Sequence, residues 1–401
     1  MKRSALSTVF LVVLIDLIGF GIVLPHLAFY ASEFHASPFM VGLLYSVYSV
    51  AQLVFSPVWG NLSDRVGRRP IMISSTLGAF AAYLVFAFSR SLGMLFLSRI
   101  LAGVMAGNIS TAQAYVADVT SSEDRAKGMG LIGAAFGIGF VVGPAIGAAL
   151  MHATPQSGFF RQNPYAALGF FAASLSFSSF LMVFFKLPES LKAGKDKKED
   201  RVAKMSVLGP NLWRTLRQGG ASRLLPVLMF SVFLLAFGQS NLYGAFPLFC
   251  KSTLGLSPGQ VGIQYVVMGI IAVIVQGGLI RVLVKKFGER PLFLAGSVFF
   301  VVGLSLIPFA HSVRMLFLFI GLMSFGGSLN GPTLNSLISK ESPPGRYGST
   351  LGASQGLSAL GRAIGPAWGG WLYGFSFRAP FIVTAFAVSL TVWAGIKIKD
   401  A

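Results

Sequence analysis

Residues 60–70 read GNLSDRVGRRP, and residues 281–291 read RVLVKKFGERP. The two stretches lie far apart in the chain, and each holds a glycine, an arginine and a proline at matching places: Gly67, Arg69 and Pro70 in the first, Gly288, Arg290 and Pro291 in the second. Similar spacings pair Pro25 with Pro247, Arg125 with Arg346, and GPAIGAAL at 143–150 with GPAWGGWL at 365–372. The chain is therefore expected to contain two halves built alike.

The composition is that of a membrane protein. Of 401 residues, 54% are hydrophobic and only 11% are charged, too few charges for the surface of a soluble protein of this size. Apolar stretches long enough to cross about 30 Å of hydrocarbon recur along the chain, and none alternates as barrel strands do. The predicted spans are residues 6–30, 40–60, 71–89, 94–117, 127–150, 164–185, 224–249, 259–283, 291–309, 314–338, 348–372 and 378–397.

Twelve spans divide into two sets of six. We therefore predict an all-α membrane protein with 12 transmembrane helices in two pseudo-symmetric six-helix bundles, residues 1–185 and 224–401. Two similar membrane halves around a central site are typical of a solute carrier that alternates access. The linker, residues 186–223, is rich in charge, and its segment SVLGPNLWRTLRQ is either a short amphipathic helix at the headgroups or an ordinary connection.

The net charge of +19 is distributed unevenly along the chain. With the N-terminus placed in the cytoplasm, 25 of the 32 Lys and Arg residues fall at cytoplasmic ends and loops. This positive-inside bias predicts that both termini are cytoplasmic, and the short loops favour a protein of the bacterial inner membrane. Charge spread over many short loops argues against nucleic acid as a partner.

Several other classes of function find no support in the sequence. There is no GxxxxGK[ST] phosphate loop, no catalytic set and no metal-ligand spacing among the four histidines, so we expect neither an enzyme nor a cofactor beyond a coupling proton. Cys250 is the only cysteine, which excludes an intramolecular disulfide. The first span is too long for a signal peptide. The expected partners are a small-molecule substrate, protons and the lipid bilayer, and the expected state is a monomer.

Two charged residues in the first half stand out because they lie inside spans. Asp16 is near the middle of the first span, where an acid costs roughly 2.5–3.5 kcal/mol to insert, so it either handles protons or is locked in a structural pair. Arg99 lies in the fourth span, where it either holds a carboxylate or snorkels to the interface. Spacings of seven place Arg99, Ala106 and Gln113 on one helix face.

Aromatic and amide side chains recur at helical spacing in several spans and predict an amphipathic cavity. Arg362, in the eleventh span, either binds an anionic group, pairs with Asp16 or donates to carbonyls at a helix break. The predicted cavity residues are Phe20, Tyr45, Tyr48, Gln52, Gln113, Gln239, Tyr243, Phe246, Gln355 and Arg362.

The polar turn after the second span is predicted to be a conformational latch and not a substrate site. Asp64 can neutralise a neighbouring arginine or lie at a helix N-terminus, where the helix dipole favours negative charge. A second charged cluster after the fourth span can belong to the same latch. The predicted latch residues are Gly60, Asp64, Arg65, Gly67, Arg68, Arg69, Asp118 and Arg125.

Small residues mark the fifth span as a helix that can pack closely against the other half of the chain and bend at a proline. It reads GIGFVVGPAIGA at 137–148, and its key positions are Gly139, Gly143, Pro144 and Gly147.

On these motifs the chain resembles the major facilitator superfamily over essentially its whole length. GNLSDRVGRRP is similar to the family's loop between helices 2 and 3, Arg99-x-x-x-Gly103 to its helix 4 motif, and residues 137–148 to its helix 5 antiporter motif. LIDLIGFGIVLP at 14–25 resembles the first helix of tetracycline and multidrug proton antiporters.

The resemblance implies that Asp16 handles a coupled proton with Arg99 nearby, and that Asp64 and Arg68 stabilise one access state against helix 11. It implies proton-driven export of a small amphipathic molecule or drug. The ninth span departs from tetracycline exporters because it has no acid, and Arg362 adds a positive charge, so tetracycline is not named as substrate. Alternatives are an organic-anion or lipid-like amphiphile transporter using Arg99 and Arg362, a uniporter or symporter, and a non-transporting membrane receptor or assembly factor.

Overall fold

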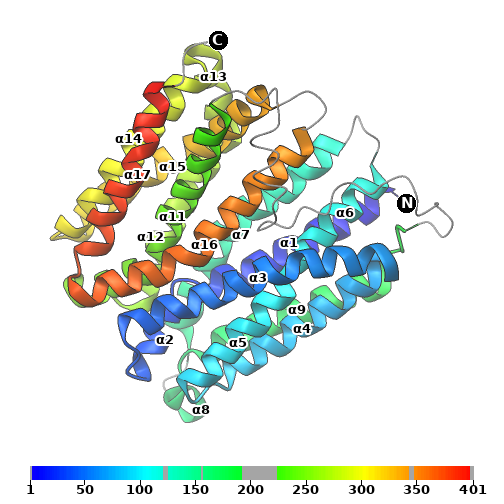
Figure 1. The fold of residues 1–401 in the computed structure, drawn as a ribbon. Coiled ribbons are helices and arrows are strands. Elements are labelled where there is room, and N and C mark those ends of the chain that lie inside the picture. The colour runs from blue at the N-terminus through cyan, green and yellow to red at the C-terminus, as the bar shows by residue number, and fades with distance from the viewer. Residues whose placement is uncertain (1, 121–124, 155–156, 192–223, 343–346, 398–401) are drawn as a thin grey trace. The chain divides into compact units, whose positions relative to one another are not determined.

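The computed structural model describes residues 2–120, 125–154, 157–191, 224–342 and 347–397, and every regular element among them is a helix (Figure 1). The amphipathic helix considered for residues 206–218 lies outside this part of the chain. Eleven helices are long and apolar enough to cross a membrane. A twelfth, α16 (Tyr347–Phe375), covers the span predicted at 348–372, and its many glycines, its serines and Arg362 make it less hydrophobic. The predicted all-α membrane fold is confirmed.

The helices of the first half follow the predicted spans with longer ends. They are α1 (Lys2–Val23), α2 (Leu27–Glu33), α3 (Pro38–Val66), α4 (Arg68–Ala87), α5 (Leu92–Met105), η1 (Ala106–Asn108), α6 (Ile109–Val119), α7 (Arg125–Ala153), α8 (Gly158–Gln162) and α9 (Ala166–Lys186). Two spans differ from a simple helix. The first, predicted at 6–30, is interrupted at 24–26 between α1 and α2, so its membrane span ends at Val23. The fourth comprises α5, the 3-10 turn η1 and α6.

The described residues of the second half also form six membrane spans. Its helices are α11 (Leu225–Leu254), α12 (Pro258–Ile274), η2 (Val275–Leu279), α13 (Ile280–Phe287), α14 (Glu289–Leu306), η3 (Ile307–Phe309), α15 (Val313–Glu341), α16 and α17 (Ala379–Lys397). The eighth span is continuous through η2, a π-helical segment that contains Gly277 and Gly278.

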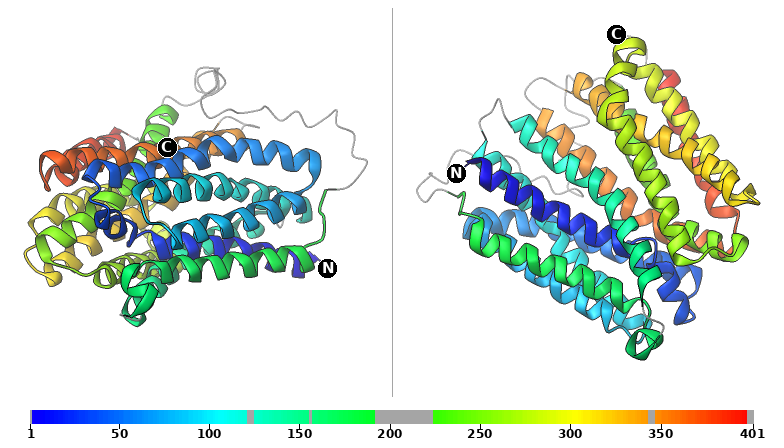
Figure 2. Two further views of the ribbon diagram at one scale, coloured as in Figure 1. Left: turned by 90° about the horizontal axis from the view of Figure 1, so that it is seen from below. Right: turned by 180° about the vertical axis from the view of Figure 1, so that it is seen from behind.

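Tertiary contacts divide the chain into two units. The first unit is Met1–Ser37, Val47–Lys197 and Leu256–Val266, and the second is Pro38–Ser46, Lys198–Gly255 and Val267–Ala401. Helix pairs correspond between them: α1 packs on α7 and on α9 as α11 packs on α16 and on α17, and α4 packs on α9 as α14 packs on α17 (Figures 1 and 2). The repeat read from the sequence is therefore present in the packing.

Glycines bring the backbones of α1 and α7 together. A Cβ atom on Gly143 would lie 2.7 Å from both Gly21 Cα and Ile18 O, and one on Gly139 would lie 2.6 Å from Leu17 Cβ. Such distances leave no room for a side chain, so these positions require glycine in a membrane interior where close van der Waals packing holds helices together. The helix 5 glycines are therefore a packing surface.

The same surface recurs in the second unit between α11 and α16. A Cβ atom on Gly361 would lie 2.7 Å from Phe233 O, and Gly365 and Gly369 face Phe237, Ser240 and Asn241. In the sequence repeat, Gly361, Gly365 and Gly369 are the counterparts of Gly139, Gly143 and Gly147. The two halves thus share one packing rule at their central helix pair.

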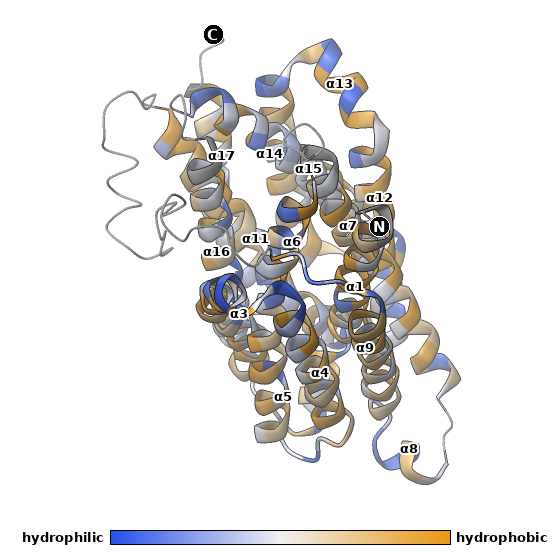
Figure 3. Ribbon diagram, turned by 90° about the vertical axis from the view of Figure 1, so that its right-hand side faces the viewer, coloured by the Kyte–Doolittle hydropathy of each residue, from blue (hydrophilic) through white to orange (hydrophobic). Residues whose placement is uncertain are grey.

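Hydrophobic side chains cover the outside of both units. Phe185, Phe375 and Phe386 are 72–80% exposed. The ribbons of α4, α5 and α9 are mostly hydrophobic along their length, whereas α13 alternates hydrophilic and hydrophobic positions (Figure 3). An apolar surface of this extent fits contact with lipid tails, and charged groups gather at helix ends.

The packing surface predicts unequal effects of alanine within one helix. Gly143→Ala is expected to lower the stability of the protein by about 1–3 kcal/mol, because the new methyl group meets the backbone of α1. Gly133→Ala, on the same helix, meets nothing within 4 Å and is expected to be neutral or slightly stabilising. Thermal unfolding in detergent would measure both. Equal melting temperatures for the two variants would contradict close packing of α7 on α1.

Candidate functional site

A carboxylate–amide pair lies in the middle of the first unit. Asn108 Nδ2 donates a hydrogen bond of 2.9 Å to Asp16 Oδ2, which joins η1 to α1. The other oxygen, Asp16 Oδ1, is covered by protein and accepts no hydrogen bond from the described residues. An ionised carboxylate has several acceptor positions, so this group keeps capacity for a proton. The sequence analysis identified Asp16 but missed Asn108.

The fourth span is interrupted by a 3-10 turn at Ala106–Asn108, which lies between Arg99 on α5 and Gln113 on α6. Arg99 is buried, whereas Gln113 is exposed. The expectation that spacings of seven place Arg99, Ala106 and Gln113 on one face stays a prediction.

Arg99 lies among aromatic rings inside the first unit. It is 2% exposed, and its Cζ stands 5.2 Å from the centroid of the Phe86 ring and 6.0 Å from that of Tyr83. Rings at this distance attract a guanidinium through their negative faces. Tyr83 reaches α1 as well, since a Cβ atom on Gly19 would lie 2.7 Å from its hydroxyl. A buried Arg99 does not fit the snorkelling alternative, and Tyr83 stands between it and α1.

The predicted cavity residues of the first unit lie on α1 and α3. Phe20 and Tyr48 have ring centroids 5.0 Å apart, and Phe20 also meets Phe140 of α7 edge-on at 5.9 Å. Gln52 Nε2 donates to Ala106 O at 3.3 Å. Tyr48 and Gln52 are half-buried. Their role as cavity lining stays a prediction.

In the second unit, Arg362 lies among polar and aromatic groups. Its Nη1 donates to Ser358 Oγ at 2.7 Å, one turn earlier on α16, and its charge acts on Tyr243 of α11. The Tyr243 ring lies 6.2 Å from that of Tyr45. Gln239 is half-buried and Gln355 is exposed, whereas Phe246 is fully buried. This set can offer a positive charge beside aromatic faces.

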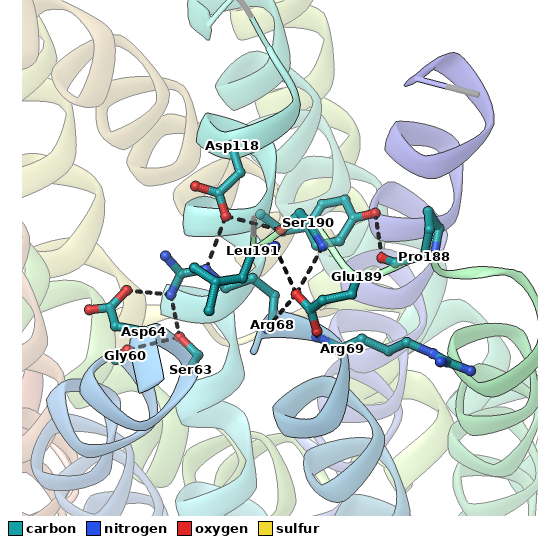
Figure 4. Close-up of polar contacts among 11 residues, drawn as sticks. Gly60, Ser63, Asp64, Arg68, Arg69, Asp118, Pro188, Glu189, Ser190 and Leu191 are labelled. Carbon is teal, nitrogen blue, oxygen red and sulfur yellow. Dashed lines mark hydrogen bonds and ion pairs between the residues drawn. The ribbon is translucent and has the colours of Figure 1, made fainter. Parts of the chain in front are cut away.

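The predicted latch is an ion-pair network built on Arg68 (Figure 4). Arg68 is 7% exposed; its Nη1 contacts Asp64 Oδ1 at 2.5 Å and Ser63 Oγ at 2.6 Å, and its Nε contacts Asp118 Oδ2 at 3.1 Å. Asp118 also accepts from Ser190 Oγ at 3.0 Å. The network ties together α3, α4, the end of α6 and the segment after α9.

Arg65 and Arg125 do not enter this description of the network. The Arg65 side chain is exposed. Within the described part of the chain, no hydrogen bond or ion pair joins it to another residue. The Arg125 side chain lies outside the described residues. Gly60 contributes its carbonyl oxygen, which accepts from Ser63 Oγ at 2.8 Å.

Glu189, a residue that sequence analysis missed, caps helix α4. Its two carboxylate oxygens accept from Arg68 N at 2.9 Å and Arg69 N at 3.0 Å, where backbone N–H groups have no partner within the helix. Asp64 lies instead in the last turn of α3. The suggestion that Asp64 lies at a helix N-terminus was therefore wrong. Only Gly67 separates α3 from α4, and its φ of 113° favours glycine.

The repeat of this motif keeps its architecture in the second unit. Gly288 separates α13 from α14 with φ 78°. Arg69 Nη2 donates to Phe184 O near the end of α9, and Arg290 Nη2 donates to Ile396 O near the end of α17. The shared glycine and arginine thus have the same structural tasks in both halves.

One ion pair changes sign between the repeats. Glu289 follows Gly288 as Arg68 follows Gly67, and it pairs with Lys340 of α15 at 2.9 Å. Ser336 Oγ also donates to Glu289 Oε1 at 3.0 Å. Each unit therefore fastens its third membrane helix to the end of its fourth by an ion pair, with opposite polarity.

No group of three or more His, Cys, Asp or Glu side chains that could hold a metal ion occurs among the described residues. Cys250 is buried.

The chain belongs to the Major Facilitator Superfamily, whose sequence model matches residues 9–227 and 228–398. It is 28% identical to tetracycline resistance protein, class B, of Escherichia coli, with 97% of each chain covered. It is also 28% identical to multidrug resistance protein 2 of Bacillus subtilis, covering 97% of this chain and 95% of that one. The protein is thus a multi-pass membrane transporter and not an enzyme.

Solved structures agree on the fold. The human organic anion transporter MFSD10 (TETRAN) superposes with a TM-score of 0.70 at 26% identity, covering 98% of this chain and 99% of that one. A bacterial homolog of the human lysosomal transporter Spinster gives a TM-score of 0.79 at 13% identity, covering 98% and 97%, and at that identity it supports the fold alone.

The ion-pair network predicts that two arginines of the same motif contribute unequally to the stability of the protein. Arg68→Gln is expected to lower stability by about 1–3 kcal/mol, because it leaves Asp118 and Asp64 without their buried donor. Arg65→Gln, on the same turn but exposed, is expected to change stability by less than about 0.5 kcal/mol. Thermal unfolding in detergent compares them. A loss for Arg65→Gln as large as that for Arg68→Gln would refute the assignment of the network to Arg68.

Proposed function

We propose that this transporter exports a small amphipathic organic molecule or drug in exchange for protons, with Asp16 as the proton-carrying group. One observation supports the proposal above others: a carboxylate lies mid-helix in α1 with one oxygen held by Asn108 and the other without a hydrogen bond among the described residues. An acid inside a membrane helix is costly to insert, which favours a function for it.

Proton binding and substrate binding are coupled if the substrate binds with different affinity to the charged and to the neutral form of Asp16. A proton neutralises the carboxylate and removes the cost of its charge in a low-dielectric interior. A substrate bound nearby changes that cost, and by linkage the proton changes the affinity for substrate by the same factor. Alternation of access between the two sides then converts proton entry into substrate exit. Arg99, one aromatic ring away from α1, adds a fixed positive charge to this field.

The setting proposed for this exchange is a bacterial inner membrane with both termini in the cytoplasm, which rests on the positive-inside distribution of Lys and Arg. The proposed working unit is a monomer that uses no cofactor other than the proton. The latch on Arg68 would then stabilise one access state.

Asp16→Asn tests the proton role. The amide keeps the shape of the carboxylate and can still accept from Asn108, but it cannot bind the coupled proton. In proteoliposomes with a pH gradient, we expect wild type to release protons when substrate is added and Asp16→Asn to lose that signal. Cationic drugs, neutral drugs and amphipathic anions would be screened in parallel.

The control for this experiment is Glu33→Gln, which neutralises an exposed acid on α2 outside the spans and is expected to transport as wild type. Uphill transport that persists in Asp16→Asn would reject proton coupling through Asp16.

A second candidate function is the transport of an amphipathic organic anion. The observation that favours it is Arg362, half-buried beside Ser358 and Tyr243, where a carboxylate or sulfonate could pair with the guanidinium while its apolar part meets aromatic rings. Human MFSD10 (TETRAN), a relative of 26% identity, is an organic anion transporter.

Arg362→Gln is expected to weaken binding of anionic substrates at least tenfold, since a charge-assisted hydrogen bond contributes about 1.5–3 kcal/mol, while neutral compounds bind as before. Tryptophan fluorescence or calorimetry in detergent would measure affinity. Arg378→Gln, an exposed arginine after α16, is the matched control and should retain wild-type affinity. Unchanged binding of every anion by Arg362→Gln would remove this candidate.

A further inference from the structure

The 3-10 turn η1, which interrupts the helix of the fourth span, and the residues beside it form hydrogen bonds with α3. Trp59 Nε1 donates to Val104 O at 2.6 Å, and Gln52 Nε2 donates to Ala106 O at 3.3 Å. From the other side of the turn, Ser110 Oγ donates to Ser56 O at 3.0 Å. Backbone carbonyls need partners inside a membrane, so a departure from α-helical hydrogen bonding persists only where such donors are supplied. Helix α3 therefore stabilises the interruption.

Close backbone contact makes this attachment stiff. A Cβ atom on Gly107, within η1, would lie 2.6 Å from Trp59 Cδ1 and 3.1 Å from Ser56 N. A tightly packed contact of this kind transmits a displacement of one element to the other. A movement of α3 at Ser56 or Trp59 must therefore move the turn.

Asn108 ends the turn and reaches α1. It is 4% exposed, and its amide donates to Asp16 Oδ2. A straight α-helix would rotate this side chain by a different angle about the helix axis, because the 3-10 turn sets about 120° per residue where an α-helix sets about 100°. The interruption therefore directs the amide to the carboxylate.

We propose that Asn108 is a positioning residue for the proton on Asp16, and that Gln52 and Trp59 tie its position to α3, so that a substrate contact on α3 changes proton binding at Asp16. The inference rests on the proposed proton role of Asp16. It adds a physical route for the coupling: α3 to the carbonyls of the turn, the turn to Asn108, and Asn108 to the carboxylate.

The direction of the effect follows from the hydrogen bond. An N–H donor favours the ionised carboxylate over the neutral acid. When Asn108 holds Asp16, the proton is released more readily, and when the turn moves Asn108 away, the proton is kept. A substrate that takes Gln52 as its own partner weakens the support of Ala106 O and so shifts the balance at Asp16.

The test measures proton-driven transport in proteoliposomes of the full chain as a function of pH. Asn108→Ala and the similarly sized Asn108→Leu lack the donor, so the midpoint of the pH profile is expected to move up by about one pH unit, the equivalent of a charge-assisted hydrogen bond of about 1.5 kcal/mol. Trp59→Phe keeps an aromatic ring but removes the donor to Val104 O, and it is expected to shift the midpoint in the same direction by a smaller amount.

The second half offers a matched control. Asn330 is an amide on α15, in the second unit. It is 1% exposed, and neither of its amide atoms has a hydrogen-bond partner among the described residues. Asn330→Ala removes a buried membrane amide that is not attached to an acid, so its pH midpoint should equal that of wild type. Melting temperatures of all variants separate folding from function.

The outcomes distinguish this inference from the function on which it rests. An unchanged midpoint in both Asn108 variants, with Asp16→Asn uncoupled, would overturn the positioning role and leave the proton role standing. A shift in the Asn108 variants without one in Trp59→Phe would overturn the link to α3. Proton-coupled transport by Asp16→Asn would reject the proposed function itself.

Discussion

The whole structure depends on how closely two helix backbones can approach in a membrane. Lipid tails are as apolar as leucine, so burial of apolar surface does little to hold helices together there, and van der Waals packing and polar contacts take over. Glycines such as Gly143 and Gly365 provide the approach in each unit. Because α1 and α11 are fixed in this way along one side, their remaining faces are available for polar groups.

Helix α1 illustrates this division of faces. Leu17, Ile18 and Gly21 face α7, whereas Asp16 turns toward Asn108 at the end of η1. Asp16 and Leu17 are neighbours in the chain, but successive residues of a helix are rotated by about 100°, so one makes a polar contact and the other a packing contact. The acid is held at a fixed height and direction by neighbours that carry no charge. Precise placement of a single carboxylate is therefore a result of the glycine packing.

Two kinds of feature could be predicted from the sequence: those that repeat, and those that are unusual by themselves. Gly67, Arg69 and the helix 5 glycines appear twice in the chain, and each pair has the same role in both units. Asp16 was found because an acid in an apolar run is a strong signal by itself. The spans were placed by their length and composition, which the bilayer fixes.

Asn108 and Glu189 carried no such signal. Asn108 was missed because a 3-10 turn cannot be read from helical spacing. Glu189 lies beyond the last residue of a predicted span and far along the chain from Arg68, whose backbone it caps. Its contact is set by tertiary packing, and no local pattern in the chain encodes it.

The opposite polarity of the two repeated ion pairs limits which residues the two halves could exchange. Arg68 with Asp118 and Glu289 with Lys340 are both attractive, but a hybrid that placed an arginine at position 289 would set it against Lys340, and like charges in contact repel. An exchange of residues between the two halves therefore keeps an attractive pair at this position only when both partners change together.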